Sequence, residues 1–243
     1  MKLAKPAYIE PTPTFTVFAD RLYLVLASIF IAALVACNLI FQKFFTWTPF
    51  GLYTFEISVG ILPYPVTFLV TDIISELYGE KRANQVVVAG FIASLFIMAV
   101  ILVAIAVPQT AWSPIDDATF KRVFGLFGPA IFASMSAYLL AQHIDIRVFH
   151  FWKRLTHGKH LWLRNNGSTI VSQFVDTLSV LSLLCLTGVI AWDRFGSLLA
   201  NGFLFKVLMA LLDTPLFYAA VMLLKPRVHQ DPEEATWSAN AAE

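Results

Sequence analysis

Charged residues are scarce in this chain of 243 residues, where Asp, Glu, Lys and Arg together make up only 14%. Soluble domains typically contain about 25% of these residues. Hydrophobic residues reach 58% and the mean hydropathy is +0.71, which predicts an integral membrane protein rather than a soluble one. The formal net charge of +1 excludes the strongly basic surface that is typical of proteins with a nucleic-acid partner.

Cysteines and the common catalytic motifs are also rare or absent. The two cysteines, Cys37 and Cys185, both fall in apolar stretches, which argues against a disulfide framework and against a cysteine-rich metal site. The chain has no G-x-x-x-x-G-K-S/T loop for nucleotide phosphates and no H-E-x-x-H, G-x-S-x-G or G-x-G-D motif. We therefore expect no enzyme, no cofactor and no metal. An intramembrane enzyme and a scaffold without a ligand are the alternatives from other classes.

Six long apolar runs are present instead. About 20 residues cross roughly 30 Å of hydrocarbon when each adds about 1.5 Å. The runs cover residues 22–41, 58–78, 86–107, 123–144, 168–191 and 198–224. They predict an all-α, polytopic membrane protein with one domain, a six-transmembrane-helix bundle over 22–224, and short tails at 1–21 and 225–243. Pro63 and Pro65 predict a break near the start of the second run.

Basic residues are distributed unevenly between the two sides of the predicted bundle. Twelve of them fall in the two tails and in the second and fourth connections, whereas four fall in the remaining connections. Connections rich in Lys and Arg stay in the cytoplasm. The sequence therefore predicts a multi-pass protein of the cell inner membrane with both termini in the cytoplasm. Segment 147–164, which mixes basic and aromatic residues, is predicted to form a helix at the cytoplasmic headgroup level.

Two carboxylates lie inside the second run. Phe68, Asp72 and Glu76 follow one another at intervals of four residues, which places them on one helical stripe beside Thr71. An ionisable side chain at this depth costs about 3 kcal/mol unless it faces the bundle interior and finds partners. We interpret the deeper Asp72 as a binding residue. Glu76 is either a binding residue or the anchor of a cytoplasmic connection, for which the candidate partners are Lys81, Arg82 and Arg164.

Other runs carry polar side chains at comparable depth. The fifth run contains a stripe with spacings of four, three and four residues, formed by Thr169, Gln173, Asp176 and Val180. Asp176 is too deep in this run to reach the interface. The sixth run has Lys206, a candidate counter-ion, with Asp213 on the same face, and Asn38 supplies an amide in the first run.

Amides, carboxylates and one ammonium group among aromatic rings suit a flat, neutral and polar heterocycle. A carboxylate accepts two adjacent N–H groups, an amide pairs with a ring carbonyl and nitrogen, and an aromatic ring stacks on the base. The sequence therefore predicts a small-molecule heterocyclic substrate. The predicted substrate-binding residues are Asn38, Asp72, Gln173, Asp176 and Lys206, with Thr71, Glu76, Thr169 and Asp213 as secondary candidates.

Small residues recur at every fourth position in the first run, at Ser28, Ala32 and Ala36. Such a stripe lets another helix backbone approach closely. It is either a packing face inside the bundle or a docking surface for a membrane partner subunit or a second copy of the chain. The residues themselves leave both interpretations open.

Three stretches carry a resemblance to a known family. These are "FLVTDIISELYGEKRA" after "PYP", "STIVSQFVDT", and "FKVLMALLDTPLFY". They resemble the queuosine precursor transporter family, a membrane group also described as vitamin-uptake-like, and the resemblance covers the chain from the first run to the sixth. It implies import of 7-deazaguanine precursors of the tRNA nucleoside queuosine. It also implies a fold similar to the substrate-binding subunits of energy-coupling-factor transporters.

The resemblance also implies a set of site residues. The matching positions are Asn38, Asp72, Ser168, Thr169, Asp176, Lys206 and Pro215. Asp213 departs from the family pattern. The alternative function is that of a substrate-binding subunit in a vitamin transporter driven by a separate ATPase module. Energy coupling is left open among proton coupling through Asp72 or Asp176, docking on such a module, and downhill entry followed by trapping.

Overall fold

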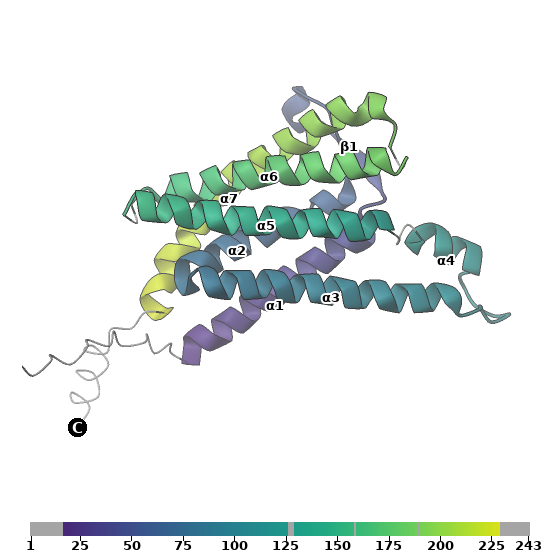
Figure 1. Ribbon diagram of the computed structural model, residues 1–243, viewed down its shortest axis with the longest axis horizontal. Coiled ribbons are helices and arrows are strands. Elements are labelled where there is room, and N and C mark those ends of the chain that lie inside the picture. The colour runs from purple at the N-terminus through teal and green to yellow at the C-terminus, as the bar shows by residue number, and fades with distance from the viewer. Residues whose placement is uncertain (1–16, 126–128, 158, 189, 229–243) are drawn as a thin grey trace, which may run out of the picture.

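The computed structural model describes residues 17–125, 129–157, 159–188 and 190–228, and these are mostly helical (Figure 1). The elements are α1 (Val17–Ile40), β1 (Phe44–Trp47), η1 (Pro49–Gly51), β2 (Phe55–Ser58), η2 (Val59–Ile61), α2 (Tyr64–Tyr78), α3 (Glu80–Ala106), α4 (Asp117–Phe124), α5 (Pro129–Leu155), α6 (Leu161–Leu186), η3 (Trp192–Arg194) and α7 (Phe195–Val228). The all-α class predicted from the sequence is confirmed. The short hairpin β1–β2 is the one sheet among the described residues.

Five segments of the described chain are long and apolar enough to cross a membrane. They are Val17–Ile40, Val59–Tyr78, Glu80–Ala106, Leu161–Leu186 and Trp192–Val228. The predicted run 123–144 has different bounds, because α4 ends at Phe124 and α5 extends from Pro129 to Leu155. The chain is therefore a multi-pass membrane protein.

The predicted break in the second run is confirmed. The short helix η2 ends at Ile61, and α2 begins at Tyr64 with Pro65 in its first turn. Gly60 allows η2 to lie against α1, because an added Cβ would come within 2.8 Å of the Cys37 carbonyl oxygen and 2.9 Å of Phe41. The Ser58 hydroxyl also donates to the Phe41 carbonyl.

The prediction of a separate surface helix at 147–164 is wrong. Helix α5 continues through Leu155 and α6 already begins at Leu161, so this segment is a helix end, a turn and a helix start. The start of α6 is polar, but it is buried at Arg164 and Asn166 (3% and 1% exposed). Both side chains find partners on other helices, which explains why a polar stretch becomes part of the bundle.

Helix α2 is the centre of the bundle. Eleven of its 15 residues are buried, and it packs against α1, α3, α5 and α7. Around it, α5 lies between α3 and α6, whereas α1 crosses at a steep angle to them (Figure 1). Apolar side chains of α1, α3 and α7 form the core around α2, among them Phe30, Val87 and Phe217, each with 0% exposure.

The connections rich in basic residues gather at one end of the bundle. The start of α1, the α2–α3 connection, the α5–α6 turn and the end of α7 all lie at this end (Figure 1). Tyr78 donates to the Ala19 carbonyl at 2.7 Å, which ties the α2–α3 connection to the start of α1. The hairpin and α4 lie at the opposite end.

Candidate functional site

A cavity of about 300 Å³ lies next to the broken second span. Residues of α1, the hairpin, η2, α2, α5, α6 and α7 line it, and most of them are apolar. Its polar lining residues are Asn38, Glu56, Ser58, Tyr64, Tyr138, Asp176, Thr177 and Lys206. An apolar cavity with a few converging polar groups is the usual form of a small-molecule site.

Asp176 is the most highly connected polar group of this cavity. Its Oδ2 atom accepts a hydrogen bond from the Tyr64 hydroxyl at 2.6 Å and one from Lys206 Nζ at 2.6 Å. Lys206 Nζ also lies 4.4 Å from the centre of the Tyr64 ring, a distance suited to a cation–π contact. Asp176 is 3% exposed, so the ammonium group provides the charge compensation that a buried carboxylate requires.

The two carboxylate oxygens of Asp176 differ in their hydrogen bonding. Oδ1 is buried and has no hydrogen-bond partner in the described chain. Asn38 Nδ2, in the wall formed by α1, is likewise buried without an acceptor. An unsatisfied buried polar atom costs about 1–3 kcal/mol, so these two atoms are available to a bound molecule. The cavity therefore offers one acceptor and one donor that the protein itself does not use.

Aromatic rings form one wall of the cavity. Tyr64 lies edge-to-face with Tyr138, with ring centres 5.8 Å apart, and Phe68 packs behind both rings. The Tyr138 hydroxyl accepts from Gln142 Nε2 at 2.9 Å, which fixes its orientation. Sequence reasoning missed Tyr64 and Tyr138. The signal for Tyr64 was its position between two prolines at the helix break, where a side chain faces an interrupted span.

Three of the five predicted binding residues line this cavity, namely Asn38, Asp176 and Lys206. The cavity lining does not include Asp72 and Gln173. Asp72 is eight residues beyond Tyr64 on α2, which corresponds to about 12 Å along a helix axis. Gln173 is buried, and its Oε1 atom has no partner in the described chain.

The secondary candidates also lie outside the cavity lining. Thr71 bonds to carbonyls of its own helix and contacts Gln142 Oε1 at 3.3 Å. Thr169 donates to the Asn165 carbonyl at 2.9 Å. Asp213 is partly buried on α7. The structure locates these residues, and their roles in substrate binding stay predictions.

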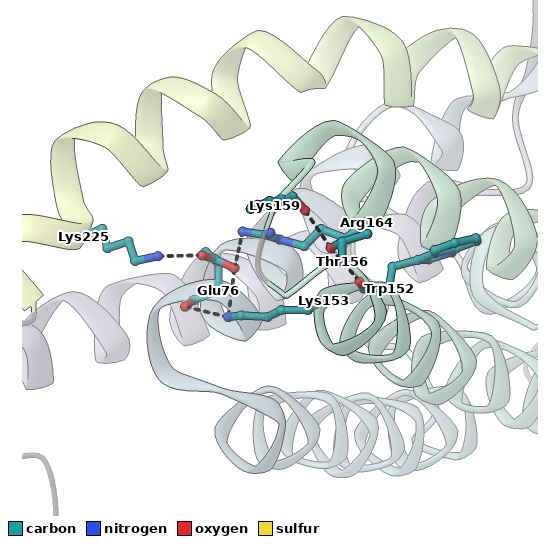
Figure 2. A network of polar contacts seen from close by, with 7 residues as sticks. All are labelled: Glu76, Trp152, Lys153, Thr156, Lys159, Arg164 and Lys225. Carbon is teal, nitrogen blue, oxygen red and sulfur yellow. Dashed lines mark hydrogen bonds and ion pairs between the residues drawn. The ribbon is translucent and has the colours of Figure 1, made fainter.

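Glu76 is the centre of an ion-pair cluster between four helices, as Figure 2 shows. Its carboxylate lies 2.9 Å from Lys153 Nζ of α5, from an Arg164 nitrogen of α6 and from Lys225 Nζ of α7. The Glu76 side chain is 1% exposed. The pairing with Arg164, one of the two interpretations of Glu76, is confirmed, whereas Arg82 pairs with Asp20 instead.

A third buried acidic group lies between Asp176 and Glu76. Asp72 of α2 and Asp145 of α5 are in hydrogen-bonding contact and are 2% and 0% exposed. Ser172 of α6 donates to Asp145 Oδ1 at 2.9 Å. Sequence reasoning missed Asp145 because it placed this residue at the start of a cytoplasmic connection. Its spacing of three residues from Gln142 was the available signal.

The small-residue stripe of α1 does not pack inside the bundle. Ser28 and Ala32 are exposed, whereas Leu26, Phe30 and Leu34 form the buried face of the same helix. The interpretation as an internal packing face is therefore wrong for Ser28 and Ala32. The Ser28 hydroxyl donates to the Leu24 carbonyl at 2.8 Å, so it is satisfied within its own helix.

The multi-pass fold and the mostly apolar cavity define a membrane protein built to accommodate a small molecule. The model of a family described as "putative vitamin uptake transporter" matches residues 58–220, and the chain belongs to this family. It is therefore a transporter and not an enzyme. No solved structure gives a significant match.

Two curated proteins show what the chain is similar to. A "probable queuosine precursor transporter" of Bacillus subtilis (strain 168) is 27% identical over 174 residues, which are 71% of this chain and 75% of that protein. A protein of the same description from Haemophilus influenzae (strain Rd) is 27% identical over 131 residues, or 54% of this chain and 53% of that protein.

Proposed function

We propose that the chain imports queuosine precursors across the inner membrane and binds them in the cavity at Asp176. The substrates are 7-deazaguanine bases such as 7-cyano-7-deazaguanine, 7-aminomethyl-7-deazaguanine or queuine. The description of both relatives as probable queuosine precursor transporters supports this class of substrate. The cavity volume of about 300 Å³ lies at the lower end for ligand sites and suits a single bicyclic base.

The proposal rests on the difference in hydrogen bonding between the two oxygens of the Asp176 carboxylate. Lys206 and Tyr64 occupy Oδ2, whereas Oδ1 is buried without a donor at the cavity wall. A 7-deazaguanine presents its N1–H and its 2-amino group side by side. One of these donors binds one lone pair of Oδ1. The other donates to the second lone pair of the same oxygen, since each carboxylate oxygen accepts more than one hydrogen bond.

The remaining walls complete the recognition of a flat base. Asn38 Nδ2, which lacks an acceptor, donates to a ring carbonyl or a ring nitrogen. Tyr64 and Tyr138 offer ring faces and edges to the planar bicycle. Unphosphorylated bases are favoured over phosphorylated forms, because Asp176 already balances the ammonium group of Lys206 in the cavity.

We further propose that α5, which has 27 residues, is the sixth transmembrane helix. It lies beside α3 and α6, both of which are apolar and long enough to span (Figure 1). The end of the bundle with the Glu76 cluster faces the cytoplasm, and both termini lie on that side. Single cysteines at position 115 and position 159, labelled with a membrane-impermeant reagent on intact cells, test this topology, since only position 115 reacts in the proposed orientation.

A binding test on the purified protein decides the proposed function. The free base 7-deazaguanine, its 7-cyano and 7-aminomethyl forms, and queuine are titrated in parallel with riboflavin and biotin. The proposal requires saturable binding of at least one deazaguanine, and uptake of the same labelled compound by cells that contain the protein but not by cells that lack it. Binding of a vitamin without any deazaguanine contradicts the proposal.

The exposed residues Ser28 and Ala32 favour a second candidate function, that of a binding subunit docked on a separate ATPase module. The two candidates differ in what they require for transport. Reconstitution of the purified chain alone into liposomes separates them. Accumulation of the labelled base without ATP or another protein contradicts the second candidate.

A further inference from the structure

Two buried carboxyl groups face each other without a counter-ion in the middle of the bundle. Asp72 and Asp145 are in direct hydrogen-bonding contact. Within the described residues, neither group has a Lys, Arg or His nitrogen within 4.0 Å. Four cations of the surrounding helices pair with other carboxylates: Lys153, Arg164 and Lys225 with Glu76, and Lys206 with Asp176.

Each of the two carboxyl groups keeps one oxygen without a protein donor. These are Asp72 Oδ1 and Asp145 Oδ2, and both residues are more than nine-tenths buried. Ser172 of α6 donates to Asp145 Oδ1 at 2.9 Å, whereas the nearby hydroxyl groups of Ser168 and Thr169 donate to the Asn165 carbonyl. The hydrophobic side chains packed around α2 come from α1, α3, α5 and α7, and no ion pair links Asp72 or Asp145 to a basic group among the described residues.

Two ionised carboxylates in contact, buried in a low-dielectric interior, repel each other too strongly to persist. A single proton removes this conflict, since a protonated carboxyl becomes a donor to its partner and satisfies both oxygens. The missing component of this site is therefore a proton.

The site is connected to the substrate cavity through α6. Ser172, the donor to Asp145, and Asp176, the carboxylate of the cavity, are four residues apart and lie on the same face of this helix, about 6 Å apart along its axis. On α2, Tyr64 contacts Asp176 and Asp72 contacts Asp145. Helices α2 and α6 thus contribute to both sites, and α5 adds Asp145 to the carboxyl pair.

We propose that Asp72 and Asp145 form an intramembrane proton-binding site whose loading and release drive uptake of the substrate bound at Asp176. The step is a simple protonation, in which one carboxylate oxygen gains a proton from the external side and later releases it to the cytoplasm. The shared proton is a property of the protein alone. The coupling to uptake rests on the proposed function.

The shared proton is tested on purified protein without any substrate. The infrared spectrum at neutral pH is expected to show the carbonyl band of a protonated carboxylic acid, and this band should disappear in both Asp72→Asn and Asp145→Asn. In either variant the new amide donates to the remaining carboxylate, which then stays ionised. Asp193→Asn, which removes an exposed acid, is the matched control and should keep the band. A band that persists in both variants, or is absent from the unmodified protein, overturns the proposal.

Coupling is tested in liposomes that contain the purified chain. For one proton per substrate, an inward gradient of one pH unit supports about tenfold accumulation of the labelled base, since one unit corresponds to about 1.4 kcal/mol. Asp72→Asn should bind the base within about threefold of the normal affinity but accumulate it only to the external concentration. Asp145→Asn provides the same readout if Asp72→Asn fails to fold.

The outcomes separate this inference from the proposed function. If no deazaguanine binds to the unmodified protein, the proposed function fails, whereas the infrared band still decides whether the proton site exists. If the base binds and accumulates in Asp72→Asn as it does in the unmodified protein, the coupling is refuted while the proposed function stands. Accumulation that follows a sodium gradient at equal pH also refutes it.

Discussion

Glu76 and Asp176 are both buried carboxylates with ion-pair partners, but their surroundings differ. Glu76 has three basic partners from three helices, at the end of the bundle where the basic connections gather. Asp176 has one basic partner and one phenol, and its second oxygen adjoins a cavity without a donor. A carboxylate surrounded by cations holds helices together, whereas one with an unused oxygen is prepared for a ligand.

The largest expected effect is that of Glu76→Gln on stability. This change removes the carboxylate that lies 2.9 Å from Arg164, whose side chain is 4% exposed, and with it the common partner of α5, α6 and α7. Breaking a buried ion pair from one side costs about 3–5 kcal/mol. Thermal unfolding of the purified protein, followed by tryptophan fluorescence, should show a strongly lowered midpoint. An unchanged midpoint would mean that the cluster is not a structural element.

The next largest effect is that of Asp176→Asn on binding. The loss of the charged acceptor should weaken deazaguanine binding by about 2–5 kcal/mol, or about 30-fold or more. Isothermal titration of the variant measures this change. Because the substitution also leaves Lys206 unpaired, the double variant Asp176→Asn/Lys206→Met is needed, and it should regain stability without regaining affinity. Normal affinity in Asp176→Asn would remove this residue from the site.

A smaller effect is expected for Tyr64→Phe. The phenol donates to Asp176 Oδ2, which keeps its bond to Lys206 when the hydroxyl group is lost. One hydrogen bond is worth about 1 kcal/mol, so we expect about fivefold weaker binding of the base and little change in stability. Tyr53→Phe is the matched control, because Tyr53 donates to Asn201 outside the cavity lining. Equal affinities for Tyr64→Phe and Tyr53→Phe would contradict the assignment.

The smallest effect is expected for Lys225→Met. Its side chain is 51% exposed, and exposed ion pairs contribute about 0–1 kcal/mol. Glu76 retains Lys153 and Arg164 in this variant, so its carboxylate stays compensated. The unfolding midpoint should move only slightly and less at high salt. A drop in the unfolding midpoint as large as that of Glu76→Gln would show that the contribution of the three cations to stability does not follow their exposure.

The sequence predicted the membrane class and the helical fold, because apolar runs of sufficient length have few other solutions. It also predicted the broken second span, since proline restricts the backbone directly. It placed the start of α6 seven residues too late, because Arg164 and Asn166 look like connection residues until their partners Glu76 and Thr214 are known. Such partners lie far away in the sequence, and periodicity within one helix does not reveal them.

For the candidate site too, the sequence predicted some features and not others. Asn38, Asp176 and Lys206 were identified by depth and residue type, and the structure brings them to one cavity. Spacing along α2 placed Asp72 with them, but its contacts are with Asp145, on a helix whose extent the sequence did not indicate. Tyr64 was missed because the prolines on either side of it indicated a break, although it lies four residues before Phe68 on the same stripe. Which polar residues share one pocket depends on the relative rotation of helices, and this is a property of the packed bundle.

The break between η2 and α2 affects how a guest molecule is recognised. Helix α2 has 15 residues and a length of about 22 Å, so it is too short to cross the hydrocarbon alone. The crossing is completed by the short helix η2, whose residues Gly60 and Ile61 line the cavity. Gly60 has no side chain and contributes backbone to the cavity wall, so this part of the wall is retained when neighbouring side chains are exchanged.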